Sequence, residues 1–457
     1  MRVRTRTVVP ALIGAALTAT CGATVPRGPL PAWHSPGLIG GLGSSDTTSA
    51  VDPALAVGAS YLPHSSVIAL RDGRALLIPS GSQTPQILPM RDPQVTAAVL
   101  SDRSWLASGQ IPGRTAAERD MAARALLDLR LLTGPNGASA ASWFGSWNYV
   151  WPRDAAFTAA AFMVTGHVAE ARRILRFLSE AQNHDGLWAA RYNADGTAVA
   201  DGRRIQLDGL GWVLWSTWLL HETGSDTGDL WPMVRQAADR MSRSLGRDRL
   251  PPVSSDYFER SPADEQAPHR PTLGVSAPIL AGLRAAAALA ADRGATGRAG
   301  RWRAAAGRLS AAITRWYGPY GYPRSPVRNG NLDASVTFLA PPFAPPSAEM
   351  DTAVLSAASK LRLPDGGVLP GQNWPGGRTE AWTPETAMFA LAAAASGRSA
   401  EATGWLDWLR AHRTSLGVLP EKVDDHGRPS SVAPLGWTDS LVLLALHTLD
   451  HQLPRAG

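Results

Sequence analysis

The stretch "GVSAPILAGLRAAAALAADR", residues 274–293, indicates the class of fold more clearly than any other part of the chain. Its apolar residues recur at positions i, i+3 or i+4, and i+7, which is the spacing of one face of an α-helix. Alanine- and leucine-rich stretches of the same kind follow one another from about residue 114 onward, and no convincing strand separates them. At about three turns for each helix, with loops between them, this part of the chain predicts eleven or twelve helices.

The connections between these helices narrow the choice among a bundle, a solenoid and a closed ring. Stretches that combine aromatic and carboxylate side chains recur at roughly every second helix. In a ring of helical hairpins, alternate connections gather at one end of the ring. No repeat of fixed length, which would indicate a solenoid, is evident. We therefore predict an all-α fold, an (α/α)6 barrel of six helical hairpins, with a short β-rich segment before it.

The chain before the helical domain (residues 114–457) divides into three parts. Residues 1–21 have the pattern of an export signal: arginines, an apolar run too short to span a bilayer, and then small residues. Residues 22–60 are rich in Gly, Pro, Ser and Thr, which predicts a linker. Residues 61–112 contain the runs "SSVIAL", "RALLIP" and "QVTAAVL", which predict strands of a small β-rich subdomain. No later segment is expected to be long and apolar enough to cross a membrane.

Cys21 is the chain's single cysteine, so the stability of the fold has to come from its core rather than from disulfides. It stands where a lipoprotein signal would end, although residues 18–20 match such a signal poorly. Two interpretations stay open: a lipid anchor on Cys21, or an ordinary cleaved signal. Either one predicts an exported protein, extracellular or attached to the outer face of the cell membrane. The sequence does not indicate an oligomeric state.

Composition argues against several classes of partner. The net charge is +6, but Lys360 and Lys422 are the only lysines, and the arginines are scattered without a basic run, so we predict no nucleic-acid partner. Seventeen tryptophans offer flat apolar faces that can stack on sugar rings, although tryptophan also fills cores. Metal-ligand spacing, a phosphate-binding loop and a G-x-S-x-G motif are not found, so we predict no metal and no cofactor.

Five stretches place charged or polar residues among aromatic ones, where neighbouring residues indicate an interior. Buried charges need partners or a ligand, so these stretches are candidates for a site. They are "YVWPRD" (149–154), "IQLDGLGW" (205–212), "DYFERS" (256–261), "LPEKVD" (419–424) and "PLGWTDS" (434–440).

In this order, over most of residues 114–453, the five stretches resemble glycoside hydrolase family fifteen, which contains glucoamylases, glucodextranases and some bacterial trehalases. "YVWPRDAAF" is the most specific part, and "PTLGVSAPILAGLRAAA" and "NLDASVTFL" add to the likeness. The separate N-terminal β-sandwich domain of that family is replaced here by the short β-like segment. The resemblance implies an inverting, exo-acting hydrolase that removes terminal sugars, with α-linked glucose as the expected sugar and an oligosaccharide or polysaccharide as its substrate.

The resemblance also implies roles for two pairs of residues. Arg153 and Asp154 correspond to a pair that grips hydroxyls of the terminal sugar, and together they offer donors and acceptors. A plain ion pair at a helix start is the alternative. Glu259 corresponds to the general acid, with Tyr257 and Phe258 desolvating it, and Glu421 corresponds to the general base, with Lys422 keeping it charged.

Further residues are expected near the same sugar. These are Tyr149, Trp151, Gln206, Asp208, Arg260, Arg378 and Trp437. Phe258 and Arg260 depart from the residues common in the family, which puts the leaving-side sugar in doubt. The other tryptophans at 188, 212, 215 and 218 are expected to pack between helices.

Two other classes of function stay open. A glycan-binding surface lipoprotein with a degraded site is one, and Phe258 and Arg260 are its support. A terpene cyclase on a similar toroid is the other, supported by "QNHDGLW" (182–188) but lacking the acidic motif of those enzymes.

Overall fold

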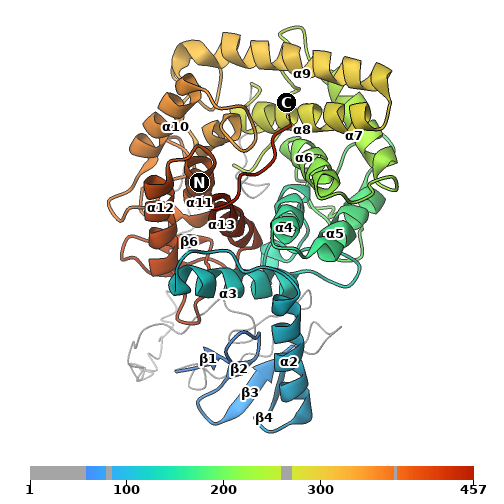
Figure 1. The fold of residues 1–457 in the computed structure, drawn as a ribbon. Helices are drawn as coiled ribbons and strands as arrows, with labels where there is room; N and C mark the ends of the chain where they lie inside the picture. Colours follow the sequence, from blue (N-terminus) through green and yellow to red (C-terminus); the bar gives the residue numbers. More distant parts are fainter. Residues whose placement is uncertain (1–57, 79–84, 144, 259–269, 375–377, 457) are drawn as a thin grey trace, which may run out of the picture. The chain divides into compact units, whose positions relative to one another are not determined.

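The computed structural model describes residues 58–78, 85–143, 145–258, 270–374 and 378–456, all within one unit, Pro31–Gly457. The described residues form twelve α-helices, α2–α13, and seven short strands (Figure 1). The predicted export signal with Cys21, and most of the predicted linker, lie outside the described residues.

Twelve elements form two concentric rings, as the prediction of an (α/α)6 barrel requires. Contacts run around the inner ring from α13 to α4, α6, α8, η3, α11 and back to α13 (Figure 1). Five inner elements are α-helices: α4 (Pro152–Val164), α6 (Asp208–Glu222), α8 (Leu273–Asp292), α11 (Thr383–Ala395) and α13 (Gly436–Thr448). The sixth position is filled by a 3₁₀-helix, η3 (Ala334–Leu339). The outer elements are α3 (Ala116–Leu132), α5 (Val168–Ala181), α7 (Trp231–Ser244), α9 (Thr296–Tyr317), α10 (Ala348–Leu361) and α12 (Ser399–Ala411).

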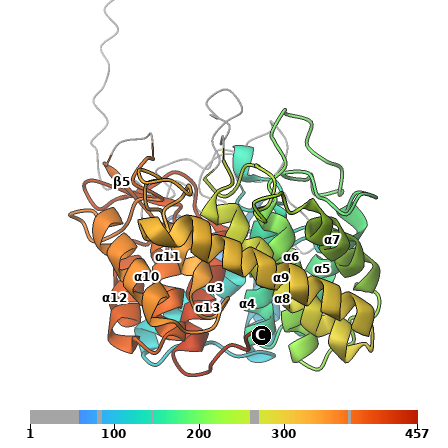
Figure 2. The ribbon, with the colours of Figure 1, turned by 90° about the horizontal axis from the view of Figure 1, so that it is seen from above.

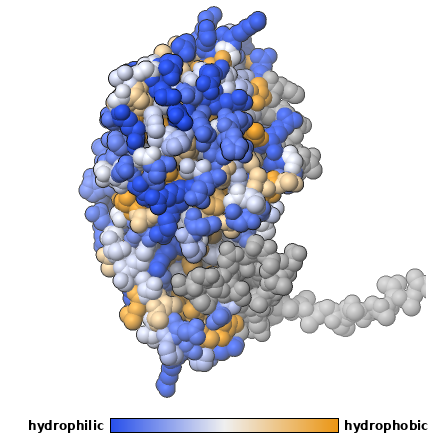
Figure 3. All heavy atoms as spheres, turned by 90° about the vertical axis from the view of Figure 1, so that its right-hand side faces the viewer, coloured by the Kyte–Doolittle hydropathy of each residue, from blue (hydrophilic) through white to orange (hydrophobic). Residues whose placement is uncertain are grey.

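The two rings differ in how their residues are buried. Every residue of α11 is buried, because an inner helix has neighbours on all sides and its alanines allow them to approach closely. In α5, by contrast, the buried residues are confined to one stripe: Ala171, Ile174, Leu175, Phe177 and Leu178. Figure 3 shows a face of the molecule that is covered mainly by hydrophilic side chains, as an outer ring of amphipathic helices should be. Trp188, Trp212, Trp215 and Trp218 are buried, as predicted for packing residues.

The closest helix packing is between α6 and α8. A Cβ on Gly211 would lie 2.1 Å from the carbonyl oxygen of Pro278, and one on Gly282 would lie 2.7 Å from the Cα of Gly211. Since these distances are far below van der Waals contact, only glycine fits at either position. The two glycines therefore bring the backbones of neighbouring inner helices together.

Helix α8 corrects one expectation from the sequence. It is long and apolar enough to cross a membrane on length and composition, and it is the one described helix that meets this test. Of its most apolar window, 89% is buried inside the barrel. A helix with protein on every side needs the same apolar surface as a membrane helix, which explains why it passes.

The connections differ in length at the two ends of the barrel. Inner helices lead to outer ones through short segments, such as residues 165–167, 293–295 and 396–398. Outer helices lead back to inner elements through long segments: 133–151, 182–207, 245–272, 318–333, 362–382 and 412–435. Figure 2 shows the longer connections, with β5 among them, at one end of the barrel. The N-termini of all six inner elements therefore lie at the end that carries the long connections.

A four-stranded antiparallel sheet precedes the barrel. Its strands pair in chain order: β1 (Ser60–Tyr61), β2 (Ile68–Ala69), β3 (Arg74–Leu77) and β4 (Gln86–Pro89). The prediction that "QVTAAVL" is a strand is wrong, because these residues belong to α2 (Pro93–Ala107). Asp92 caps this helix by accepting the Gln94 N–H, and Pro93 occupies its first turn. This start signal outweighs the β-branched residues.

A second, three-stranded sheet lies within the helical domain, where no strand was predicted. It consists of β5 (Glu380–Trp382), β6 (Lys422–Asp424) and β7 (Pro429–Ser430). Two or three residues are too few to show alternation in a sequence. The pairing of Trp382 with Lys422 places the segment before α11 beside the segment before α13.

Candidate active site

Each inner element has an acidic residue at or near its start. They are Asp154 for α4, Asp208 for α6, Asp333 for η3, Glu385 for α11 and Asp439 for α13. Asp256 reaches the start of α8 by accepting a hydrogen bond from Thr272, the residue before that helix. Helix N-termini favour negative charge. Since all six N-termini lie at one end, the barrel gathers carboxylates there, as the sequence predicted for alternate loops.

Arg153 lies beside two of these acids, Asp154 and Asp208, and it is 7% exposed. Its Nη1 donates to Gln206 Oε1 at 2.9 Å and to Asp208 Oδ2 at 3.0 Å, and its Nη2 lies 3.2 Å from Asp154 Oδ2. The guanidinium also lies over the ring of Trp437, 4.8 Å from its centroid. Burial lowers the pKa of Arg153, but the carboxylates of Asp154 and Asp208 raise it by more. The net pKa lies above the usual value for arginine, so the side chain stays charged. Four other residues of the predicted sugar site thus meet around the Arg153 guanidinium.

Several polar atoms in this region lack a hydrogen-bond partner, counted over the described residues. We call the residues that carry them, together with Asp333 and Glu421, the barrel-end cluster. The atoms without a hydrogen-bond partner are Arg153 Nε, Asp154 Oδ2, Gln206 Nε2, Asp208 Oδ1, Tyr257 Oη, Glu385 Oε2 and Trp437 Nε1. Native proteins satisfy nearly all buried polar groups, so such a concentration of donors and acceptors is typical of a place where a polar ligand binds.

Glu421, the predicted base, is 6% exposed and lies just before β6. Trp147 Nε1 donates to its Oε1 at 3.0 Å, and the Ser431 hydroxyl donates to its Oε2. Its backbone carbonyl accepts from the Thr383 N–H at 3.0 Å, at the start of α11. The carboxylate is therefore held by one donor on each oxygen and by a fixed backbone.

The pKa of Glu421 differs from the expectation that Lys422 keeps it low. Burial raises it, and although Ser431, Lys422 and Trp147 each lower it, the net pKa lies above the usual value for glutamate. Lys422 is itself engaged elsewhere, 3.4 Å from Glu380 Oε2 and 4.4 Å from the centroid of the Trp382 ring. Desolvation thus outweighs the neighbouring ammonium group.

The segment that leads to Glu259 is connected to the base through aromatic rings. Phe258 lies edge-on to Trp374 at 4.7 Å between centroids, and Trp374 lies edge-on to Trp382 at 4.7 Å. Trp382 in turn pairs with Lys422, the residue after Glu421. Glu259 and Arg260 themselves lie outside the described residues, but a peptide bond links Glu259 to Phe258. Phe258, the residue before the predicted acid, is thus connected to the segment that holds Glu421.

Arg324 fixes the same segment from the other direction. It donates to Asp256 Oδ1 and to Asp333 Oδ2, both at 2.8 Å, and its guanidinium lies 4.2 Å from the centroid of the Phe258 ring. Asp256 also accepts the Phe258 N–H at 2.9 Å. These contacts hold the backbone at residues 256–258 against the barrel.

The remaining aromatic candidates lie beside a further arginine. Trp151 is 7% exposed and immediately precedes α4, and the Tyr149 ring lies edge-on to it at 6.4 Å. Arg191 lies over both rings, 4.2 Å from the Tyr149 centroid and 5.1 Å from that of Trp151. Its Nη1 donates to the Ser146 carbonyl at 2.6 Å, and its Nη2 to Asp201. Arg191 therefore joins the segment before α4 to the segment before α6.

Arg378 is exposed, and the contact described for it is a 3.4 Å hydrogen bond to the carbonyl of Lys360, near the end of α10. This contact does not join it to the barrel-end cluster. Its expected role toward the leaving-side sugar stays a prediction.

Burial raises the pKa of every carboxylic acid in the cluster: Asp154, Asp208, Asp333, Glu385 and Glu421. Burial raises the pKa of Asp208 to about 6, against the lowering effect of Arg153. Burial, and then the negative charge of Glu421, raise the pKa of Glu385 to about 8, although Arg153 lowers it. At neutral pH Glu385 is therefore mainly a neutral carboxylic acid. Strongly shifted acids in one place are typical of catalytic sites.

Sequence reasoning missed five residues of this region: Trp147, Arg191, Arg324, Asp333 and Glu385. Trp147 stands two residues before the motif "YVWPRD" and Asp333 stands in "NLDASVTFL", so their positions could have drawn attention. The neighbours of the other three in sequence carry no signal.

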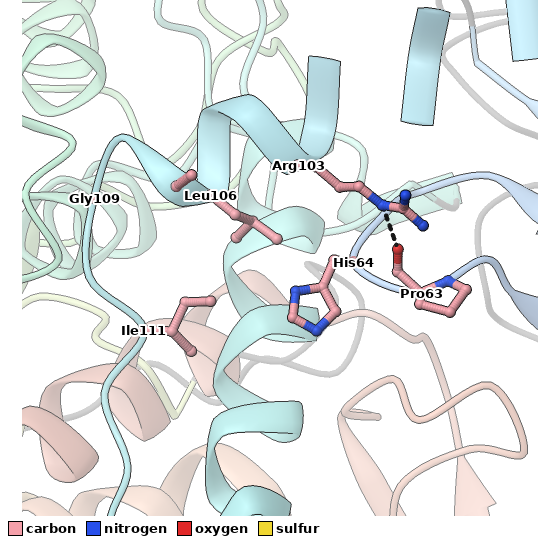
Figure 4. A pocket seen from close by; sticks show the side chains of 7 residues that line it. Pro63, His64, Arg103, Leu106, Gly109 and Ile111 are labelled. Atoms are coloured by element: carbon pink, nitrogen blue, oxygen red, sulfur yellow. Dashed lines mark hydrogen bonds between the residues drawn. The ribbon is translucent and has the colours of Figure 1, made fainter. Parts of the chain in front are cut away.

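Two cavities among the described residues lie away from the Arg153 contacts. One, of about 540 Å³, is lined mostly by apolar groups between the β1–β2 turn and the end of α2, with His64, Leu106 and Ile111 around it (Figure 4). The other, of about 910 Å³, lies between α2, α3 and the segment before α4, and Tyr149 is the predicted site residue that lines it. Neither of these two linings contains an acid of the barrel-end cluster.

One group of described residues has metal-ligand geometry: Asp424, Asp425 and His426. Asp424 ends β6, and Asp425 and His426 begin the turn to β7. Asp424 already accepts hydrogen bonds from Arg428 and from the His426 N–H. Asp425 and His426 are exposed, and exposed acidic groups are common without a bound ion.

Comparison with known proteins agrees with this architecture. No protein-family model matches the chain, and no curated protein sequence matches it. Among solved structures, a wild-type glycosidase shares 22% identity at a TM-score of 0.63, over 73% of this chain and 97% of its own. A bacterial glucoamylase complexed with acarbose shares 18% identity at 0.63, over 79% and 59% of the two chains. The glucoamylase of Saccharomycopsis fibuligera shares 14% identity at 0.58, over 75% and 97%. The chain thus has the (α/α)6 fold of glucoamylases, as the resemblance implied.

Proposed function

We propose that the protein is an exo-acting, inverting glycoside hydrolase that removes terminal α-linked glucose from oligosaccharides or polysaccharides. One observation carries the proposal: Arg153, Glu421 and the segment before Glu259 are joined through Trp437, Trp374 and Trp382 at one end of a glucoamylase-like barrel. The contact between Trp437 and Tyr257, whose ring centroids are 6.0 Å apart, links Arg153 to the segment before Glu259.

In the proposed reaction, Arg153, Asp154 and Asp208 bind hydroxyls of the terminal sugar. A sugar hydroxyl both donates and accepts, so the arginine and a carboxylate together satisfy it. Their fixed ion pairs leave Arg153 Nε and Asp208 Oδ1 without partners in the described structure. A sugar that lacks the matching hydroxyl would leave these atoms unpaired, which is how such a site selects.

Glu259 gives its proton to the leaving oxygen, and Glu421 takes a proton from the attacking water. Inversion needs carboxyl groups about 6.5–9.5 Å apart, so that the water fits between the base and the anomeric carbon. Trp147 and Ser431 each occupy one lone pair of Glu421 and hold its orientation. The remaining lone pairs can bind water. A base with a raised pKa takes up the proton more readily near neutral pH.

The test is a panel of α-linked disaccharides, with maltotriose and isomaltotriose, followed by NMR that resolves the two anomers. The first product expected is β-D-glucose. Glu421→Gln and Glu259→Gln should each reduce kcat about a thousandfold or more while circular dichroism stays unchanged. Cleavage that survives in both variants would refute the assignment of the acid and the base. Sugar binding without any cleavage by the wild type would favour the glycan-binding alternative.

We extend the proposal to location: the enzyme is exported and anchored at the outer face of the membrane through a lipid on Cys21. The support is the sequence pattern of residues 1–21. Mass spectrometry of the mature N-terminus, with Cys21→Ser as the control, tests it. A mature chain that begins elsewhere, or carries no lipid, would refute the anchor.

A further inference from the structure

Glu385 is a buried acid that the proposed reaction does not use. It belongs to the first turn of α11 and is 2% exposed. The helix begins at Thr383, whose N–H and hydroxyl both donate to the backbone carbonyl of Glu421, at 3.0 and 3.1 Å. The hydroxyl of Thr383 also lies 2.8 Å from that of Thr438, at the start of α13. The backbone that carries Glu385 is therefore fixed directly to the backbone of the predicted base.

The charged and titratable groups that act on the Glu385 carboxyl come from four other elements. They are Glu421 before β6, Arg153 on α4, Asp333 before η3 and Tyr257 before α8. The geometry of the backbone gives the same location: Glu385 is in the first turn of α11, and Thr383 at the start of that helix bonds to the Glu421 carbonyl and contacts Thr438 at the start of α13. The residue therefore lies at the end of the barrel that carries the barrel-end cluster.

The Oε2 atom of Glu385 has no hydrogen-bond partner among the described residues. Tyr257 Oη and Trp437 Nε1, which belong to the same cluster, also lack one. A buried polar atom without a partner destabilises the folded protein, and an apolar side chain of the same length would avoid that cost. Stabilisation of the helix N-terminus does not explain why a glutamate stands at position 385. Burial keeps its carboxyl group neutral at neutral pH, and a neutral group gains little from the helix dipole.

Building on the proposed function, we propose that Glu385 is a further substrate-binding residue, whose carboxyl group hydrogen-bonds one hydroxyl of the terminal sugar. As a neutral acid it both donates and accepts, as a sugar hydroxyl does. The residue then determines specificity: a sugar that lacks this one hydroxyl leaves the acid unpaired and binds more weakly, whereas loss of another hydroxyl affects other residues.

The probes are D-glucose and its 2-, 3-, 4- and 6-deoxy analogues, titrated calorimetrically into the wild type, Glu385→Gln and Glu385→Met at pH 6.5. We expect the wild type to bind one analogue about tenfold to a hundredfold more weakly than glucose because of Glu385. Glu385→Met should bind glucose as weakly as that analogue and no longer distinguish the two. Glu385→Gln, which keeps a donor and an acceptor, should retain most of the discrimination.

Glu118→Gln is the matched control, because Glu118 is also a buried acid in the first turn of a helix, but its carboxylate caps outer helix α3 through the Thr115 and Arg114 N–H groups. It should lower stability and leave sugar discrimination unchanged. A second readout serves if Glu385→Met does not fold. The wild type should change its discrimination between pH 6.5 and 9.5, as Glu385 loses its proton, and Glu385→Gln should not.

Cleavage of maltotriose by the wild type tests the proposed function separately. A wild type that cleaves maltotriose, beside a Glu385→Met variant that still distinguishes every analogue, overturns only the role of Glu385. A wild type whose glucose binding depends on Glu385 but which cleaves nothing supports that role and overturns hydrolysis. A wild type that binds none of the five sugars overturns the inference.

Discussion

Arg153 and Arg124 are both buried arginines beside two acids, and the difference between their surroundings separates a candidate site from a structural joint. Arg124, on α3, donates to the Ser65 carbonyl at 2.9 Å, to Ser66 Oγ at 3.1 Å and to Asp128 Oδ1 at 3.1 Å. Its guanidinium also lies 3.9 Å from the centroid of the Tyr61 ring. Asp128 is on α3 itself, and the other partners belong to the N-terminal sheet and its first turn, so Arg124 joins that sheet to the barrel.

Arg153 instead is surrounded by residues from the long connections and the starts of inner helices. Its neighbours Gln206, Asp208 and Trp437 all keep polar atoms without partners in the described structure. A buried ion pair is weak evidence for stability, because desolvation offsets most of the attraction. Tyr61 Oη and Asp128 Oδ2 beside Arg124 also lack a described partner, so unpaired atoms do not by themselves separate the two arginines. Their positions do: Arg153 lies at the start of α4, at the end of the barrel where the long connections and Glu421 gather, whereas Arg124 contacts the N-terminal sheet and its first turn. The comparison predicts that changes at Arg153 reduce activity and that changes at Arg124 reduce stability.

Arg153→Met should have the largest effect. It removes the donors for the sugar and leaves Asp154 and Asp208 buried without a cation, so we expect kcat/KM on the best disaccharide to fall about a thousandfold, or roughly 4 kcal/mol. Initial rates measured below KM test this. If activity falls less than tenfold in a folded variant, the guanidinium does not bind the substrate and is a structural ion pair like Arg124.

Arg124→Met should cost about 3 kcal/mol of unfolding free energy, because it removes one partner of a buried ion pair. Denaturant unfolding measures this, and limited proteolysis should show earlier cleavage in residues 58–78. The rate per folded molecule should stay within about threefold of the wild type. A loss of activity as large as that in Arg153→Met would show that the two arginines are not separate in function.

Asp439 and Asp128 beside Arg124 predict a dependence of stability on pH. Burial raises the pKa of Asp128 to about 6 and that of Asp439 well above its usual value, and both oxygens of Asp439 lack a described partner. An acid whose pKa is raised by folding contributes stability at low pH that is lost as the pH rises from its unfolded value, near 4, through its folded value.

Asp439→Asn replaces the proton-bearing acid by a neutral amide. The unfolding free energy of the variant minus that of the wild type should therefore increase by about 2 kcal/mol between pH 5 and pH 8. Unfolding in urea at several pH values measures the difference. The control is Asp120→Asn, on the exposed side of α3, which should show little pH-dependent change. A difference for Asp439→Asn that shrinks with pH would mean that Asp439 is ionised in the folded protein.

The ring of helices could be predicted from the sequence because each helix shows its own periodicity locally. In the stretch that forms α8, apolar residues recur at helical spacing. The pair Arg153–Asp154 lies among aromatic residues at the start of a helix. By contrast, β5 and β6 pair Trp382 with Lys422 across forty residues, and neither strand is long enough to show a pattern. Pairing of this kind follows from the closed barrel, which only the whole chain defines.

The same limit applies within the barrel-end cluster. Glu421 was predicted because its own motif is distinctive, whereas Glu385 stands in "TPETAMFALAAAA", which indicates only a helix. Its partners Arg153, Tyr257 and Glu421 lie on other elements, so its importance depends on tertiary structure. The strand prediction for residues 94–100 is wrong for a different reason: the Asp92 cap and Pro93 start a helix, and this local signal outweighs the β-branched residues.

Trp147→Phe should have the smallest effect and sharpens the comparison within the predicted site. Phenylalanine keeps an aromatic ring but removes the Nε1–H that donates to Glu421 Oε1 at 3.0 Å. Since Trp147 lowers the pKa of Glu421, its loss should raise that pKa and shift the acidic limb of the kcat profile to higher pH, with kcat about tenfold lower, or roughly 1.4 kcal/mol. The matched control, Trp316→Phe, removes an exposed indole donor on α9 that bonds the Asp248 carbonyl, and should leave the pH profile unchanged. A variant with reduced kcat but an unshifted acidic limb would show that Trp147 packs against the site without tuning the base.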